Sequence, residues 1–343
     1  MSTIADMRGT MTARRFALGV MTCAALAAGC DTLGLTYGDA NSVIAVMAPE
    51  RWDEVAEDVY AALERTIVTV RDEKTFTVTY QEPYGDEWQD LSRFRQLLLV
   101  GQLGDPWIAE AIADAEPAIT VPGLYRVQDV WSRGQTVTVV VLSAAGGAEE
   151  LEEHLPAVAG QLDADFRTFA RNRMYTTGVD TALADTLYTQ AKFAVLVPEV
   201  YRWTRTDSTY VFRNDNPDPS ELIREVVVSW VSPVPPELPP DSVLAWRARV
   251  VAEHYSEPQE VVPDAMTFER LAFSNYIALE IRGQWRNPPD RGWPAGGPFI
   301  TRAAVCEGQD RAYLLDAWLY APGVEKYEYM IQLETILETF RCD

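Results

Sequence analysis

One short segment near the start of the chain constrains the fold most, because it decides which residues belong to the folded body. Two arginines precede a mostly apolar run from Phe16 to Ala28, which has the length of a signal peptide and is too short to span a bilayer as a finished helix. The run ends in the sequence Leu26-Ala27-Ala28-Gly29-Cys30. We therefore expect residues 1–29 to be a lipoprotein signal peptide and Cys30 to be the site of lipid attachment.

Lipid attachment at Cys30 predicts a protein held on a membrane. Its body would face the periplasm or the cell exterior, and the outer membrane is the favoured location. A diacylglycerol and an N-acyl chain bury many methylene groups at about 0.8 kcal/mol each, so the attachment would be stable. One competing interpretation is an ordinary signal peptide cut near Ala28, which leaves Cys30 as a free thiol. Arg14-Arg15-Phe16 also resembles part of a twin-arginine signal, although the neighbouring residues fit that signal poorly.

The charge of the chain is strongly acidic. Its 343 residues include 51 Asp and Glu against 29 Lys and Arg, and only three of the basic residues are lysines. A dense acidic surface with few lysines keeps a protein soluble in strong salt, where repulsion is screened, so we interpret the surface as halophile-like. A cation-binding face is the alternative. The same charge argues against a nucleic-acid partner, because phosphates would be repelled.

Two of the four cysteines are expected to remain in the folded body beyond the lipidated one. Cys306 ends a predicted strand, and Cys342 follows the last predicted helix. The expected compartment is oxidising, so an even pair of cysteines there is a disulfide candidate. The alternative is two unpaired thiols.

Residues 42–180 are predicted to form an N-terminal α/β domain, preceded by a short tether at residues 30–41. Continuous apolar runs alternate with amphipathic segments, and a hairpin signal at residues 132–135 requires the sheet to be at least partly antiparallel. The predicted strands cover residues 43–47, 75–80, 97–100, 124–131 and 136–142, and the predicted helices cover 50–65, 86–96, 106–115 and 149–174.

Residues 181–343 are predicted to form a C-terminal α+β domain that begins with three strands in a meander. The predicted strands cover residues 193–201, 209–213, 223–231, 267–273, 276–285, 299–306 and 312–320, and the predicted helices cover 242–254 and 325–340. The fold class is therefore α+β. Two α/β layers are expected, in which mixed or antiparallel sheets pack with helices after the cleaved signal.

The C-terminal third carries recognisable motifs. Glu280-Ile281-Arg282-Gly283-Gln284-Trp285, Gly296-Gly297-Pro298-Phe299, the run from Tyr313 to Gly323, and Lys326-Tyr327-Glu328-Tyr329-Met330 follow one another in that order. In this the chain resembles an uncharacterised bacterial lipoprotein family, catalogued as domain of unknown function 4837. The resemblance implies an N-terminal lipoprotein signal, in agreement with the segment above. It implies no established activity.

The segment from Arg282 to Phe299 is the candidate ligand-binding surface. Its glycines permit close backbone approach, and two tryptophans flank a Pro-Pro turn. Such a loop could hold a glycan or a peptide by stacking and hydrogen bonding, whereas the alternative is a long hairpin connection whose tryptophans pack on the core. The candidate residues are Arg282, Trp285, Trp293, Gly296 and Gly297.

A further binding candidate is Asp316, which interrupts an apolar strand between Leu315 and Ala317. Its carboxylate is expected to face Arg282 or Arg302 if it belongs to a binding site. The alternative is a carboxylate on the solvent face of the sheet or in an ion pair.

The sequence contains no recognisable catalytic or metal-binding motif. Only two histidines occur, His154 and His254, and neither HExxH, Gly-x-Ser-x-Gly nor a Cys/His cluster is found. The segment Asn214–Asp218 resembles a calcium loop only weakly, because it lacks the required glycine and the distal glutamate. We therefore assign no catalytic residue, metal or cofactor.

These observations predict a non-catalytic, membrane-anchored binding or assembly factor of the cell envelope, with a protein or a glycan as its partner. The alternative is a carboxylate-dependent hydrolase acting on envelope glycan or peptide. A pocket with two facing carboxylates and aromatic walls would favour the hydrolase. A shallow, exposed apolar patch near Trp285 would favour partner binding.

Overall fold

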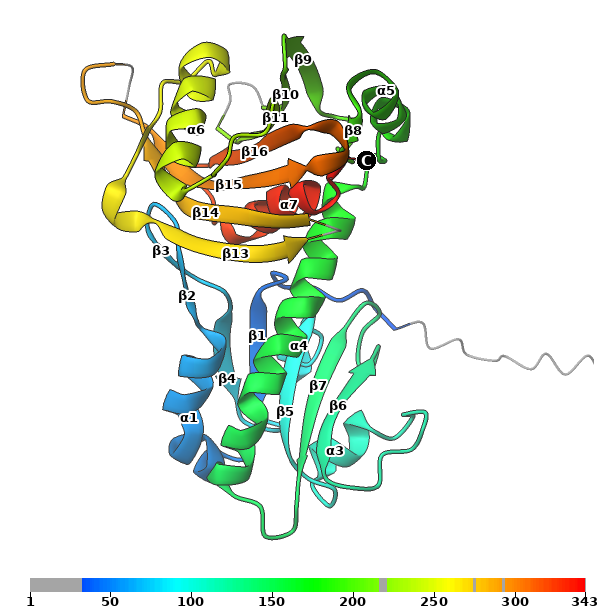
Figure 1. The fold of residues 1–343 in the computed structure, drawn as a ribbon. Coiled ribbons are helices and arrows are strands. Elements are labelled where there is room, and N and C mark those ends of the chain that lie inside the picture. The colour runs from blue at the N-terminus through cyan, green and yellow to red at the C-terminus, as the bar shows by residue number, and fades with distance from the viewer. Residues whose placement is uncertain (1–32, 216–220, 274–275, 292–293, 343) are drawn as a thin grey trace, which may run out of the picture. The chain divides into compact units, whose positions relative to one another are not determined.

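The computed structural model describes residues 33–215, 221–273, 276–291 and 294–342. The range Gly34–Asp343 forms one compact unit that contains two large sheets (Figure 1). The expected signal peptide and Cys30 lie outside the described residues, and the predicted domain boundary after residue 180 lies within the compact unit.

The first sheet has the strand order β4-β1-β5-β7-β6. Its first four strands in this order are parallel, and β6 is antiparallel to β7 across the predicted hairpin. The central strands are continuous apolar runs because helices cover both faces. The expectation of a mixed sheet is confirmed. The strands are β1 (Ser42–Val46), β4 (Thr77–Gln81), β5 (Gln96–Gln102), β6 (Gly123–Gln128) and β7 (Thr136–Leu142).

The side chains of β1 alternate between two cores. Val43 and Ala45 pack with α1 (Pro49–Leu63) and α4 (Ala148–Met174), whereas Ile44 and Val46 pack with α2 (Trp88–Leu91) and α3 (Pro106–Ala111). The helix predicted at residues 86–96 is thus a single turn. It ends early because the backbone of Arg93 and Arg95 hydrogen-bonds with Tyr37, a residue of the predicted tether.

A hairpin of β2 (Thr66–Val68) and β3 (Asp72–Lys74) was not predicted. It extends from the first half of the chain toward β13 and β14 of the second sheet (Figure 1). The side-chain amide of Gln284 donates a hydrogen bond to the carbonyl of Thr69 and so joins the hairpin to the second sheet.

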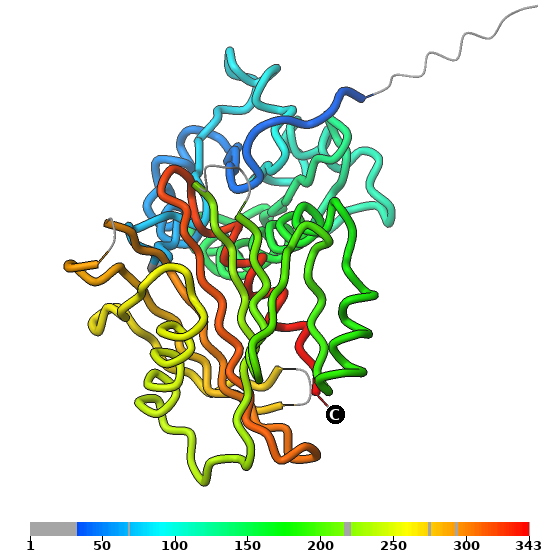
Figure 2. Tube along the Cα trace, turned by 90° about the horizontal axis from the view of Figure 1, so that it is seen from above, coloured from blue at the N-terminus to red at the C-terminus, as the bar shows by residue number. Residues whose placement is uncertain are grey.

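The second sheet is antiparallel throughout and has the order β12-β14-β15-β16-β11-β10-β9, with β13 also paired to β14. One face packs on α6 (Pro240–His254), and the other packs on α5 (Thr181–Ala191) and α7 (Tyr327–Glu338), as Figure 2 shows from above. The strands are β9 (Arg202–Thr206), β10 (Thr209–Asn214), β11 (Ile223–Val231), β12 (Glu260–Val261), β13 (Thr267–Phe273), β14 (Tyr276–Arg286), β15 (Gly296–Cys306) and β16 (Arg311–Tyr320). Two short 3₁₀ turns, η1 (Pro263–Ala265) and η2 (Glu307–Gln309), also lie in this half.

The strand predicted at residues 193–201 is wrong. Only Phe193–Ala194 is extended, as β8, which pairs with β17 (Arg341–Cys342), and β9 takes the expected place in the meander. Val195 and Val197 are buried in the core beneath the second sheet. The apolar run is therefore a buried connection, which local periodicity cannot distinguish from a buried strand.

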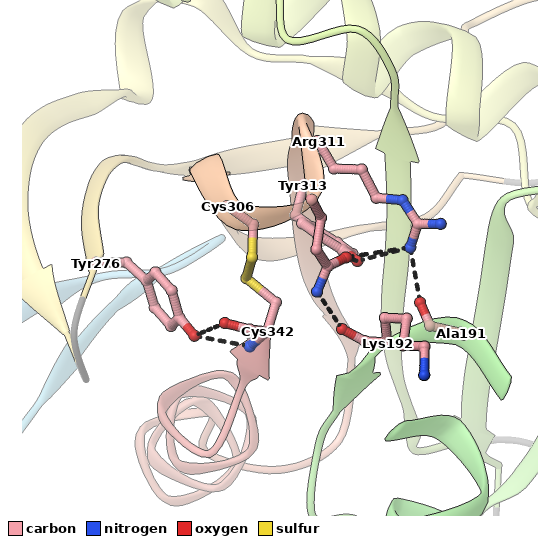
Figure 3. The surroundings of a disulfide bond; sticks show 8 residues. Ala191, Lys192, Tyr276, Cys306, Arg311, Tyr313 and Cys342 are labelled. Carbon is pink, nitrogen blue, oxygen red and sulfur yellow. Dashed lines mark hydrogen bonds between the residues drawn. A yellow bond between two sulfur atoms is a disulfide. The ribbon is translucent and has the colours of Figure 1, made fainter. Parts of the chain in front are cut away.

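A disulfide closes the C-terminal end of the fold (Figure 3). It joins Cys306, at the end of β15, to Cys342, and the two Cα atoms lie 6.3 Å apart. The Tyr276 hydroxyl accepts a 2.7 Å hydrogen bond from the Cys342 amide and donates one to the Cys342 carbonyl. Through Cys342 the chain that follows α7 is thus fastened to the sheet.

Candidate functional site

A pocket of about 400 Å³ lies between the second sheet, α7, α4 and the β2–β3 hairpin. Its volume is within the range of about 300–1,000 Å³ that is typical of small-molecule sites. We call it the junction pocket, because elements from both halves of the chain line it. Its apolar wall includes Ile67, Met266, Phe299, Ile300, Met330 and Ile331.

The pocket forms where the edge of β14 loses its partner. β13 pairs with β14 as far as Arg282, the Val262 amide donates to the Gln284 carbonyl, and β12 pairs from Trp285, so η1 interrupts the ladder opposite Gly283. A Cβ atom on Gly283 would lie 2.8 Å from the Phe299 ring and 3.0 Å from Met266. Glycine is therefore required for the close approach of these two side chains at the pocket wall.

Arg282 forms the polar part of the wall together with two carboxylates. Its Nε donates to Glu280 Oε1 at 2.6 Å, and its Nη2 donates to Glu334 Oε1. Arg302 lies behind this pair and donates from Nε to Glu280 Oε2 at 2.7 Å. The arginine side chains differ in exposure, since Arg282 is 41% exposed and Arg302 only 2%.

Arg167 of α4 continues this network from the first half of the chain. Its Nη1 donates to Glu334 Oε2 at 2.7 Å, and its Nε donates to Asp163 at 2.8 Å. Asp163 also accepts a hydrogen bond from the Tyr327 hydroxyl. We call Arg167, Arg282, Arg302, Asp163, Glu280 and Glu334 the arginine–carboxylate network; it contains three cations and three anions.

The network keeps Glu334 ionised. Burial by itself would raise the pKa of this carboxyl, but the charges and hydrogen bonds of Arg282 and Arg167 outweigh it, and the pKa is lowered. Both oxygens of Glu334 accept hydrogen bonds from arginines. Glu334 is therefore poorly suited to act as a general acid at neutral pH.

The sequence-predicted surface residues have divided roles. Arg282 lies in the junction pocket, whereas Trp285 is only 1% exposed and packs edge-on against Trp318 with ring centroids 5.2 Å apart. Its indole donates to the Leu319 carbonyl at 3.2 Å. Trp285 therefore belongs to the core, which agrees with the alternative interpretation. Trp293 lies outside the described residues.

Gly296 and Gly297 serve strand packing. They pair with Arg286 and Trp285 across the β14–β15 ladder. A Cβ atom at Gly297 would lie 1.7 Å from the Leu319 carbonyl oxygen, and one at Gly296 would lie 2.9 Å from the Trp285 carbonyl oxygen. The backbone approach is therefore to neighbouring strands.

Asp316 does not face Arg282 or Arg302, so the arrangement expected for a binding role of this residue is wrong. Asp316 is fully buried and accepts a 2.9 Å hydrogen bond from Arg247 of α6, with further hydrogen bonds from Tyr255 and Thr301. The reason is strand alternation, because Asp316 points to the α6 face while the arginine–carboxylate network lies on the α7 face. The ion-pair alternative describes this residue.

A second polar cluster, at Glu225, was not predicted. Glu225 accepts hydrogen bonds from Arg213 and from the Trp318 indole, both at 3.0 Å, and Arg213 also pairs with Glu257. Burial raises the pKa of Glu225 to about 7, although Arg213 and Trp318 oppose the rise. The signal was a glutamate within the apolar run of β11, but the sequence did not indicate its partners. A cavity of about 320 Å³ adjoins this cluster beside His254, which ends α6 as expected.

Within residues 33–215, 221–273, 276–291 and 294–342, no group of three or more His, Cys, Asp or Glu side chains could hold a metal ion. In the same part of the chain, no helix has both the length and the hydropathy of a membrane span.

Residues 180–339 match the family model described as domain of unknown function (DUF4837). No curated protein matches the chain in sequence. Three solved structures with some similarity are the Saccharomyces cerevisiae Ran-binding protein Mog1p, PsbP (CyanoP) of Synechocystis sp. PCC 6803, and Mycobacterium tuberculosis LpqN, which is described as involved in cell envelope biogenesis.

These structural similarities are weak. Mog1p is 10% identical over 44% of this chain and 90% of its own, with a TM-score of 0.29. CyanoP is 10% identical over 45% and 89%, with a TM-score of 0.30, and LpqN is 14% identical over 43% and 81%, with a TM-score of 0.27. At such scores no functional conclusion is transferred from these proteins.

Proposed function

We propose that the protein is a membrane-anchored envelope lipoprotein that binds a ligand in the junction pocket without catalysing a reaction. Most of this pocket is lined by residues 180–339, which match the model of a domain of unknown function (DUF4837). The sequence Leu26-Ala27-Ala28-Gly29-Cys30 supports a lipid anchor on Cys30. The body would face the periplasm or the exterior, on the outer membrane in the favoured case. An envelope protein or glycan would be its partner in assembly.

The hydrogen bonding and ionisation of the pocket carboxylates favour a binding role over hydrolysis. A glycoside hydrolase needs one protonated carboxyl and one free carboxylate at a working separation. In the junction pocket the lowered pKa of Glu334 opposes a protonated form, and Glu280, 3% exposed, is held between Arg282 and Arg302. The wall therefore offers a fixed polar surface in which arginines engage both Glu280 and Glu334.

The position of the pocket supports a ligand-dependent role for the whole body. Its walls include Ile67 of β2, Arg167 of α4, Arg282 of β14 and Glu334 of α7. A bound ligand would contact both halves of the chain at once. Binding to the folded state alone would raise the stability of the complete unit by mass action.

Intact-mass spectrometry of the native protein extracted from membranes tests the anchor. We expect a mature chain that begins at Cys30 and carries diacylglycerol and N-acyl masses, and we expect Cys30→Ser to lose the lipid mass. An unmodified thiol at Cys30 in the native protein would refute the anchor.

Incubation of the native protein with isolated cell-wall fragments and envelope peptides tests the absence of catalysis. We expect no released product by mass spectrometry. Turnover that disappears in both Glu280→Gln and Glu334→Gln would overturn the binding role and establish a hydrolase at this pocket.

A further inference from the structure

We propose that the ligand of the junction pocket is an acyl chain whose head group presents hydrogen-bond acceptor oxygens, as in a carboxylate or an ester. The alkyl part would lie on the apolar wall, and the oxygens would bind the guanidinium groups of Arg167 and Arg282. This inference rests on the proposed binding role of the pocket and names the chemical class of its ligand.

The apolar wall matches a flexible hydrocarbon chain. Its six side chains come from β2, β15, α7 and the residue between η1 and β13, and two of them are methionines. Methionine side chains are unbranched and adapt to the shape of a ligand. Burial of each methylene group on such a wall favours binding, and the volume of about 400 Å³ suits a single chain.

The polar wall supplies donors, while the oxygens of Glu280 and Glu334 are already engaged, and Asp264 adds one exposed carboxylate to the lining. Arg282 donates to its carboxylates through Nε and Nη2, and Arg167 donates through Nε and Nη1. Each guanidinium carries five N–H groups, so Arg282 Nη1 and Arg167 Nη2 are available for a ligand. The two side chains are 41% and 39% exposed, so the unused nitrogens can be reached.

The same excess of donors continues behind the wall. Arg302 is 2% exposed, and within the described residues its Nη1 is buried without a hydrogen-bond partner. Glu334, by contrast, has both oxygens occupied by arginines. The complementary head group must therefore bring acceptors.

The charge balance of the network decides which heads are acceptable. Its three arginines are matched by three carboxylates, and Asp264 adds a further negative charge to the lining, so the ligand needs no full negative charge to neutralise the wall. A carboxylate can form a bidentate pair with a guanidinium, and an ester carbonyl can accept a single N–H. An ammonium head offers donors only, so it cannot accept from the free N–H groups of Arg167 and Arg282, and it is the poorer match to this wall.

The pocket is a poor match for the glycan expected from the sequence. A sugar presents hydroxyl donors around its ring and is usually held by accessible aromatic faces and acceptor side chains. The sequence predicted that Trp285 stacks on such a ligand, but Trp285 is buried against Trp318. Acyl chains, in contrast, would be abundant next to a body anchored at the membrane surface.

Photolabelling of the native, membrane-extracted protein in phospholipid nanodiscs tests the proposal. The probe is an alkyl carboxylate with a diazirine in the chain, and peptide mass spectrometry locates the label. We expect labelling in residues 263–273 and 327–338. Decanoate and monodecanoin should compete with the probe, whereas decylammonium should not. Equal competition by decylammonium, or labelling spread evenly over the surface, would overturn the inference.

Two matched pairs of variants separate pocket binding from general effects. Ile67→Trp fills the pocket and should reduce labelling at least tenfold, whereas Ile277→Trp places the same residue at a 73% exposed site on β14 and should leave it unchanged. Arg282→Lys should weaken decanoate binding about tenfold, because lysine lacks the planar set of donors of the guanidinium. Arg286→Lys should leave decanoate binding unchanged, because Arg286 pairs with Glu260 outside the pocket. Circular dichroism confirms that each variant is folded.

The outcomes distinguish the ligand class from the binding role. If the pocket variants abolish binding of a different class, such as decylammonium or a muropeptide, the acyl inference fails and the binding role stands. If no native ligand is released from the protein on denaturation and no probe labels the pocket, both fail.

Discussion

Two sets of buried ion pairs lie on opposite faces of the same sheet, and they differ in access to solvent. On the α6 face, Asp316 and Arg247 are 0% and 1% exposed, and Tyr255 and Thr301 complete the hydrogen bonds of the carboxylate. On the α7 face, Arg282 reaches a pocket and is 41% exposed. The first pair is sealed within the core, while the second forms a wall that a ligand can contact.

The difference teaches that charge in an apolar strand does not by itself mark a site. The sequence predicted Asp316 as a binding candidate because it interrupts an apolar strand. The side chains that hydrogen-bond to it nevertheless lie within the core. Glu280 lies in the motif that carries the family resemblance and supports Arg282 in the pocket wall. What separates the two is whether a cavity adjoins the pair, and a cavity depends on how distant elements pack.

The largest expected effect is on the sealed pair. Asp316→Ala should cost about 3–5 kcal/mol of unfolding free energy, because Arg247 would remain buried without a counter-charge. Denaturant unfolding measures the change, with Asp290→Ala at an exposed position as the control. A loss below about 1 kcal/mol would show that Arg247 reaches water and that the two faces are alike.

Removal of the disulfide should destabilise the α7 face of the sheet, on which the pocket network lies, more than the α6 face. Cys306→Ala with Cys342→Ala opens a link between residues 36 apart in sequence, and the chain-entropy model gives a loss of about 3–4 kcal/mol. Hydrogen exchange should increase in α7 more than in α6, because Cys342 follows α7. Equal increases in both helices would show that the two faces are not independent.

A rise in pH should change the stability contributed by Glu225, on the α6 face, and by Glu334, on the α7 face, in opposite directions. Between the ordinary value of 4.5 and about 7, the unfolded chain releases a proton that Glu225 keeps in the folded state, so stability falls by about 3 kcal/mol as the pH rises. Glu225→Gln should remove this slope from thermal unfolding measured between pH 4.5 and 8. An unchanged slope would place the titrating group elsewhere.

The pH dependence of stability that Glu334 contributes has the opposite sign to that of Glu225. Because its folded pKa is lowered, its contribution is present above the unfolded value of 4.5 and is lost as the pH falls through the folded pKa. Glu334→Gln should therefore reduce the loss of stability on acidification below pH 4.5. The wild-type protein measured alongside it serves as the reference, and an identical acid limb in both proteins would contradict the assignment.

The smallest effect is expected from truncating the pocket wall. Glu334→Ala should cost only about 2 kcal/mol, because the partly exposed Arg167 and Arg282 can be rehydrated. Denaturant unfolding beside Asp316→Ala gives the comparison directly. If the two variants lose the same free energy, exposure to the pocket does not distinguish the two sets of ion pairs.

The sequence by itself determined the elements whose periodicity is strong. The strands β14 and β16 and the helices α4, α6 and α7 lie close to where apolar alternation or helical spacing placed them, whereas β15 begins earlier, at Gly296. The mixed α+β class followed from the order of these elements. Such patterns are local, because they record which side chains of one element share a buried face.

Tertiary structure alone decided the rest. It left residues 195–201 outside the strands of the sheets, brought the β2–β3 hairpin against β14, and paired Asp316 with Arg247 instead of Arg282 or Arg302. The junction pocket also arose only there, where η1 leaves the edge of β14 open. The physical reason is that periodicity fixes the face a side chain points to, whereas its partner across that face is fixed by packing between segments far apart in the chain.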